Sequence, residues 1–148
     1  MRNYSWLALS VVISALAGMP ALADGDTKKG KKVFKKCKAC HMVGEKAKKR
    51  VGPPLNDLFG RKAAGFEGFK YSKVLVSLGE AGLVWNEETV AGYLKNPKKW
   101  LKAKAPELDL KCADVGNCRG KMAFGGLKKD KQIKNVIAYM KQFDQTPE

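Results

Sequence analysis

Three features that often direct the reading of a sequence are missing here. No stretch alternates apolar and polar residues in the manner of a half-buried strand, and no segment is repeated. After residue 23, no apolar run is long enough to span a membrane. The lack of strand patterns predicts an all-α fold, and the lack of a spanning run predicts no stable membrane insertion of the mature chain.

Acidic residues are also scarce. The 148 residues include 14 Asp and Glu against 29 Lys and Arg, so the net charge is +15. A surface this positive attracts anionic partners, such as acidic protein surfaces, nucleic acid or anionic lipid. The compartment in which the protein works decides among these partners.

The N-terminus has the pattern of a secretory signal peptide. Arg2 precedes an apolar run over residues 6–17, which is too short to span a bilayer comfortably, and Ala21 and Ala23 form a small-x-small cleavage site. Cleavage after Ala23 would leave residues 24–148 in the bacterial periplasm, where nucleic acid is not an expected partner. An uncleaved membrane anchor is the alternative.

Helical periodicity and capping residues outline the rest of the chain. We expect a helix over residues 27–39, mostly loop over 42–69, a short helix after Ser72, and another from Asn86 to about Asn96. Residues 101–126, with Pro106 and four glycines, are expected to form one long loop. Asp130 should cap the last helix, whose buried stripe is Ile133, Val136, Ile137, Met140 and Phe143.

The strongest chemical signal is a C-x-x-C-H motif formed by Cys37, Cys40 and His41. This spacing is typical of covalent attachment of one c-type haem: the two thiols add to the haem vinyl groups, and the histidine becomes the proximal ligand of the iron. A thioredoxin-like redox pair is an alternative, but it needs a preceding strand. A zinc site is another, in which Cys112 and Cys118 would supply the second pair.

His41 is the only histidine, which excludes an intramolecular bis-histidine haem. Methionine is the next common ligand, and Met122 lies in a glycine-flanked loop far along the chain from His41. The other four methionines have simpler explanations. Met1 and Met19 would leave with the signal peptide, Met42 is adjacent to His41, and Met140 is explained by core packing. Met122 could instead be a packing residue, and a lysine could replace it at high pH.

A six-coordinate iron leaves no vacant site for oxygen or peroxide, so the sequence predicts an electron carrier and not an enzyme. Two other classes stay open at this point. One is a haem enzyme or ligand sensor, such as a small peroxidase, which would require Met122 to leave the iron. The other is a zinc-stabilised basic binding module that uses all four cysteines.

Further motifs occur in a fixed order: GKKVF at 30–34, CKACH at 37–41, VGP at 51–53, LFGRK at 58–62, LVW at 83–85, YLKNPKK at 93–99, KMAF at 121–124 and IAYM at 137–140. Together they resemble class I cytochromes c, in particular bacterial cytochrome c2 and mitochondrial cytochrome c. The similarity covers residues 26–101 and 120–144, and it implies the class I cytochrome c fold of short helices around one haem.

The resemblance also implies roles for residues around the haem. The Pro53 carbonyl would orient His41, and the Tyr93 hydroxyl would point toward the Met122 sulfur. Hydrogen bonds to the buried haem propionates would come from Arg61, Tyr71 and Trp85, and Phe124 would lie beside the haem edge. Gly30, Phe34 and Tyr139 would form the crossing of the first and last helices.

The resemblance places a ring of basic residues around the haem edge, namely Lys36, Arg50, Lys98, Lys99, Lys121, Lys128 and Lys129. Such a ring steers acidic redox proteins. The implied donor is a cytochrome bc1-type complex, or equally a periplasmic dehydrogenase. The implied acceptor is an oxidase, a photosynthetic reaction centre or a reductase, and the carrier itself is expected to be a monomer.

Three departures from the family pattern stand out. Gly120 and Leu75 replace a threonine and an asparagine of the family, and an inserted loop at about 102–119 separates Trp100 from Met122. In an oxidising periplasm Cys112 and Cys118 should form a disulfide within this insertion. We expect the disulfide to strengthen the iron–methionine bond, and Glu107 and Asp109 to influence the choice of partner.

Overall fold

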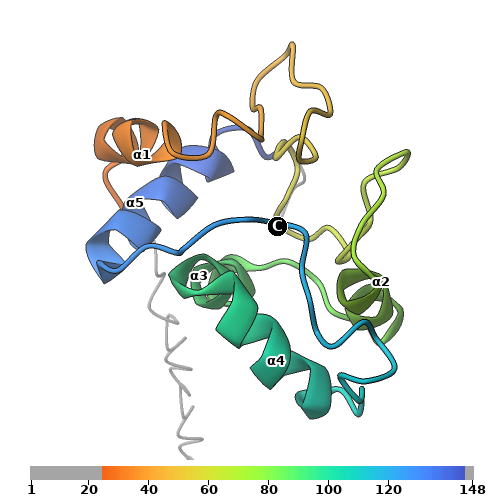
Figure 1. The fold of residues 1–148 in the computed structure, drawn as a ribbon. Helices are drawn as coiled ribbons and strands as arrows, with labels where there is room; N and C mark the ends of the chain where they lie inside the picture. Colours follow the sequence, from red (N-terminus) through yellow and green to blue (C-terminus); the bar gives the residue numbers. More distant parts are fainter. Residues whose placement is uncertain (1–24, 146–148) are drawn as a thin grey trace, which may run out of the picture.

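The computed structural model describes residues 25–145, and in this part of the chain it contains five α-helices and no β-strand. The helices are α1 (Thr27–Phe34), α2 (Lys73–Glu80), α3 (Glu87–Lys95), α4 (Pro97–Glu107) and α5 (Asp130–Lys141) (Figure 1). One isolated antiparallel bridge joins Lys62 to Val84. The expectation of an all-α fold is therefore confirmed, while the predicted signal peptide, 1–23, lies outside the described residues.

Of the helix pairs in the described residues, α1 and α5 make the most extensive contact (Figure 1). A side chain at Gly30 would place its Cβ 2.0 Å from the Asn135 carbonyl oxygen, so only glycine allows the backbones to approach this closely. Next to this point, the rings of Phe34 and Tyr139 lie 5.3 Å apart. The predicted crossing of the first and last helices is present.

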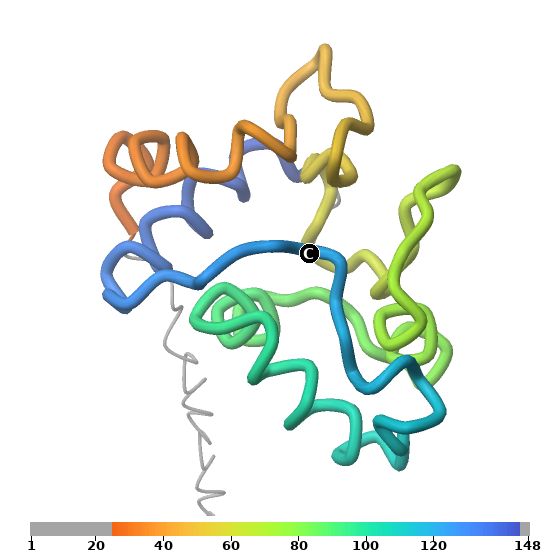
Figure 2. The backbone as a smooth tube through the Cα atoms, in the orientation of Figure 1, coloured from red at the N-terminus to blue at the C-terminus, as the bar shows by residue number. Residues whose placement is uncertain are grey.

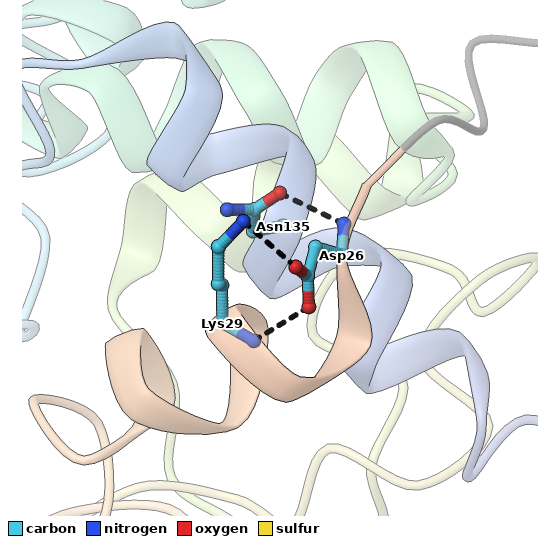
Figure 3. Close-up of polar contacts among 3 residues, drawn as sticks. All are labelled: Asp26, Lys29 and Asn135. Atoms are coloured by element: carbon cyan, nitrogen blue, oxygen red, sulfur yellow. Dashed lines mark hydrogen bonds and ion pairs between the residues drawn. The ribbon is translucent and has the colours of Figure 1, made fainter.

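The entry into α1 is also tied to α5. The Asp26 side chain accepts a hydrogen bond from the Lys29 backbone N–H, and the Asp26 backbone N–H donates to Oδ1 of Asn135 at 2.9 Å (Figure 3). The Lys29 ammonium group lies 3.0 Å from the same carboxylate. These contacts with Lys29 hold the pKa of Asp26 below its usual value of 3.8. Asn135 itself is buried, and the apolar stripe did not predict it.

The helices in the middle of the chain begin near the expected residues. Ser72 precedes α2, although its side chain makes no capping hydrogen bond. Asn86 caps α3 through a capping box with Thr89, and α3 ends at Lys95. Helix α1 is shorter than expected, because it ends at Phe34 and turns follow as far as residue 40.

Two sequence-based expectations are wrong. Residues 101–107 are helical and belong to α4, not to a loop. Pro97 occupies the first turn of this helix, where its missing backbone N–H leaves no hydrogen bond unmade, and Pro106 is tolerated near the helix end. Leu101 and Ala105, four residues apart, are both buried, which was the available helical signal. The second error concerns the cap of the last helix. Asp130 was expected to be the cap, but it is the first residue of α5, and Lys129 occupies the N-cap position.

The rest of the insertion is a compact turn followed by an extended segment. A disulfide joins Cys112 to Cys118, and both Cys118 and Val115 are buried. Asn117 and Cys118 adopt left-handed backbone conformations. The chain then runs back across the middle of the molecule to α5 (Figure 2), where the Leu127 N–H donates to the Leu94 carbonyl of α3. This path carries Met122 toward the centre of the fold.

Candidate cofactor site

The residues singled out by their chemistry gather around one open cavity of about 250 Å³. Its walls come from the turns after α1, residues 51–61, α2, α3, residues 121–124 and α5. Most of the surface is apolar and is contributed by Leu55, Leu58, Leu75, Val90, Leu94 and Val136. The helices thus leave a mostly apolar space, with a few polar groups at defined places.

The C-x-x-C-H motif lies on the α1 side of this cavity. Successive turns follow α1, in which the Cys37 N–H donates to the Phe34 carbonyl and the His41 N–H donates to the Cys37 carbonyl. These turns bring both thiols and the imidazole to the same wall. Burial, with a smaller effect of the neighbouring Cys40, raises the pKa of the Cys37 thiol to about 11.

The His41 ring is held in one orientation by its neighbours. Its Nδ1 lies 2.7 Å from the Pro53 carbonyl oxygen, which can only accept, so Nδ1 carries the proton and Nε2 keeps a free lone pair. A Cβ at Gly52 would lie 2.4 Å from the ring, which shows how closely the backbone passes. Burial lowers the pKa of His41 and favours the neutral imidazole, against the smaller opposing effect of the Pro53 hydrogen bond.

Met122 reaches the cavity from the extended segment after the insertion. It is half-buried and shares the lining with Tyr93 and Phe124. Burial raises the pKa of Tyr93 to about 12, so its hydroxyl stays protonated and can donate a hydrogen bond. At the cavity mouth, the Lys121 ammonium group donates to the Lys70 carbonyl at 2.8 Å and ties this segment to the opposite rim.

A second group of polar side chains also lines the cavity. The Arg61 guanidinium donates to the carbonyls of Pro54 and Asn56, and burial lowers the pKa of Arg61. Tyr71 and Trp85 line the same region. Burial also raises the pKa of Tyr71, an effect that the charge of Arg61 partly offsets. These residues could hold an anionic group away from bulk water.

Sequence reasoning missed Ser72, which it treated only as a helix cap. Ser72 is among the residues that line the cavity, and its hydroxyl is fully buried and has no hydrogen-bond partner among residues 25–145. Leaving a buried hydroxyl unpaired costs about 1–3 kcal/mol, so a group bound in the cavity is expected to supply its acceptor. The only signal in the sequence was the position of Ser72 directly after Tyr71.

The zinc alternative does not fit the described part of the chain. Cys112 and Cys118 are bonded to each other, while Cys37 and Cys40 are free thiols at the cavity. Within residues 25–145, no group of three or more His, Cys, Asp or Glu side chains could hold a metal ion. The thioredoxin-like alternative lacks the strand that should precede its cysteine pair in the same residues.

Comparison with known proteins decides the family. The family described as Cytochrome c matches residues 27–144. The chain belongs to the cytochrome c family. It is 46% identical over 115 residues to a cytochrome c2 of Afifella marina, covering 78% of this chain and 80% of that protein. It is 43% identical to a cytochrome c-554 of Methylosinus trichosporium, covering 97% and 95% of the two chains.

The fold agrees with this assignment. The structure of cytochrome c2 from Rhodospirillum centenum superimposes with a TM-score of 0.72 at 39% identity, over 81% of this chain and 99% of that one. The protein is therefore an electron-transfer cytochrome of the class I, cytochrome c2-like type, and it binds one covalent haem c with its iron. The cavity suits this cofactor, because it combines apolar walls, two free thiols and an unpaired buried hydroxyl.

The structure brings most of the predicted site residues of this cytochrome together. The cavity lining includes Cys37, Cys40, His41, Pro53, Arg61, Tyr71, Trp85, Tyr93, Met122 and Phe124. Of the predicted partner surface, Lys36 and Lys121 lie at the same cavity. Arg50 donates to the Lys38 carbonyl nearby, and the remaining members, Lys98, Lys99, Lys128 and Lys129, are exposed.

Proposed function

We propose that this cytochrome is a periplasmic one-electron carrier whose haem iron is bound by His41 and Met122. The observation that carries the proposal is that the His41 imidazole, the Met122 thioether and the two free thiols line a single cavity. When bound, haem c supplies a one-electron Fe(III)/Fe(II) couple. If His41 and Met122 both held the iron, no vacant site would remain for a substrate, which favours a carrier over an enzyme.

Each neighbouring residue has a defined task in this proposal. Cys37 and Cys40 form the thioether links, and Pro53 keeps Nε2 of His41 directed into the cavity. Tyr93 donates a hydrogen bond toward the Met122 sulfur. Fixed ligands and apolar walls limit rearrangement when the charge of the site changes, which favours fast electron exchange.

The carboxylates of the bound group also need partners, because burying them without donors would cost several kcal/mol. Arg61 supplies the opposite charge, and Tyr71, Trp85 and Ser72 supply neutral donors. Ser72 gains the acceptor that the protein itself does not provide. This assignment gives the buried hydroxyl a partner.

Partner choice follows from the charge of the protein. The net charge of +15 and the exposed basic residues around the cavity mouth attract acidic redox proteins and accelerate encounter. The proposed donor is a cytochrome bc1-type complex or a periplasmic dehydrogenase, and the proposed acceptor is an oxidase, a reaction centre or a reductase. We propose that the carrier works as a monomer.

The periplasmic assignment rests on the predicted signal peptide and its cleavage after Ala23. Among residues 25–145, no helix has the length and apolar character needed to cross a membrane. An oxidising compartment would also keep the bond between Cys112 and Cys118 intact. Mass spectrometry of the exported protein should find an N-terminus at Asp24 and a mass that includes one haem.

Visible absorption spectra of the purified holoprotein test the proposed ligation. We expect sharp c-type bands on reduction and, in the oxidised protein, the weak far-red band of an iron–sulfur bond, which Met122→Ala should abolish. Potentiometric titration should show one reversible one-electron step. A high-spin spectrum of the wild-type protein, or peroxidase turnover at rates typical of enzymes, would overturn the carrier assignment in favour of a haem enzyme or ligand sensor.

A further inference from the structure

A second cavity, of about 350 Å³, lies on the Met122 side of the molecule, between α4 and the end of the insertion. Its floor includes Leu101 and Cys118, each 1% exposed. Tyr93, Met122 and Phe124 line both this cavity and the haem cavity. The two spaces are therefore separated by only one layer of side chains.

The lining of the second cavity is positively charged. Lys98, Lys102 and Arg119 contribute three cations, and no carboxylate is among the lining residues. Within residues 25–145, none of these three cations forms an ion pair. The nearby Glu107 is already paired with Lys104, so it does not neutralise them. The cavity thus carries an unbalanced positive charge above an apolar floor.

Two of these cations belong to the insertion. Lys102 lies in α4, and Arg119 directly follows Cys118. Val115 and the disulfide-bonded Cys118 are both buried, and they anchor the turn that carries Arg119. A positioned cation loses less entropy on binding than one on a free loop. The insertion therefore forms one wall of a preorganised basic pocket.

We propose that this pocket receives a protruding glutamate or aspartate side chain of the acidic redox partner. The apolar floor accommodates the methylene stem, and the three cations at the rim pair with the carboxylate. A partner held there contacts the side-chain layer shared with the haem cavity, which keeps the electron path short. This inference rests on the proposed carrier function and extends the partner surface beyond the basic ring into the insertion.

The test uses the holoprotein and a short peptide of alternating glutamate and alanine as the probe. Amide chemical shifts of the reduced, diamagnetic protein are followed at low ionic strength. We expect shifts at residues 101–102 and 117–120, and about tenfold weaker peptide binding by Lys102→Glu/Arg119→Glu, because two favourable charge contacts become repulsive. A peptide of alternating glutamine and alanine should cause no shifts at these residues.

The matched control is Lys28→Glu/Lys134→Glu, which changes the net charge by the same amount on the exposed surfaces of α1 and α5. If both double variants weaken binding equally, the effect is one of overall charge and the pocket proposal fails. It also fails if inorganic phosphate produces the same shifts with the same affinity, since the pocket would then be a small-anion site. Neither result touches the carrier function, which fails only if the holoprotein lacks a reversible one-electron step.

Discussion

The two sides of the haem cavity are built in different ways. On the His41 side, the proposed ligand, both cysteines, Gly52 and Pro53 lie in one short stretch of chain, and the Nδ1 contact of 2.7 Å fixes the ring. On the Met122 side, the proposed ligand follows α4, the disulfide-closed turn and part of an extended segment. Within the described residues, no backbone N–H of residues 120–123 donates to a backbone carbonyl.

This difference separates a ligand held by local geometry from one held by tertiary packing. Segments with few backbone hydrogen bonds open at low free-energy cost, whereas the turns around His41 are tied by backbone hydrogen bonds such as that from the Gly52 N–H to the Cys40 carbonyl. We therefore expect the His41 side to set the stability of the holoprotein, and the Met122 side to set the lability of its iron ligation. Five predictions follow this contrast and its surroundings, from the largest expected effect to the smallest; the first three test the contrast itself.

Removing the Met122 ligand should have the largest effect. Met122→Ala is expected to abolish the far-red band and to lower the reduction potential, because a thioether ligand stabilises the reduced iron. Absorption spectroscopy and potentiometry measure the two effects. The control is Met140→Leu at a buried position of α5 that also lines the cavity, and it should keep the band. Loss of the band in both variants would contradict the assignment of Met122.

The helix crossing should be the next most sensitive point. Gly30→Ala would place a methyl group 2.0 Å from the Asn135 carbonyl oxygen, so α1 or α5 must shift, at a cost of about 2 kcal/mol in the free energy of unfolding. Gly125→Ala, on the Met122 side, meets no atom within 4 Å and should change stability by less than about 0.5 kcal/mol. Denaturant unfolding compares the two, and equal losses would remove the proposed contrast.

Removal of the disulfide should act mainly on the Met122 side. Cys112→Ala/Cys118→Ala is expected to lower the free energy of unfolding by about 2 kcal/mol at most, since the closed loop is short. The far-red band should disappear at a lower temperature than the helical signal, and imidazole should bind the oxidised iron more tightly. Unchanged imidazole affinity would show that the insertion does not support Met122.

The unpaired hydroxyl of Ser72 offers a test based on the sign of the change in holoprotein stability when it is removed. If Ser72 donates to the bound cofactor, Ser72→Ala should destabilise the holoprotein by about 1 kcal/mol. If the hydroxyl stays unpaired in the holoprotein, the same substitution should leave stability unchanged or increase it. Thermal unfolding of the holoprotein distinguishes the two results, and the far-red band should persist in either case.

The Asp26 cap should give the smallest effect, visible only in acid. Its folded-state pKa lies below 3.8, so the ionised carboxylate stabilises the folded state above that value, and the contribution is lost as the pH falls through the lowered pKa. Asp26→Asn keeps a capping side chain but cannot titrate. Its free energy of unfolding should therefore fall less than that of the wild type between pH 5 and 3, and parallel pH curves would contradict this account.

Local signals predicted much of the fold. The capping residues Ser72 and Asn86 located the starts of two helices, and the apolar stripe located α5. The error over residues 101–107 arose because Pro106 suggested a loop, whereas proline is tolerated where packing of Leu101 and Ala105 stabilises the helix. Asn135 and Ser72 were missed because neither polar residue shows in its local pattern that it will be buried.

The sequence by itself determined the basic charge and indicated the covalent chemistry and the two proposed iron ligands, because motif spacing and composition do not depend on the path of the chain. Only the tertiary structure decided that Ser72 lacks a protein partner and that Lys98, Lys102 and Arg119 share a pocket beside Met122. Those residues lie far apart in the chain, and the packing of α4 and the insertion against α3 and the Met122 segment brings them together.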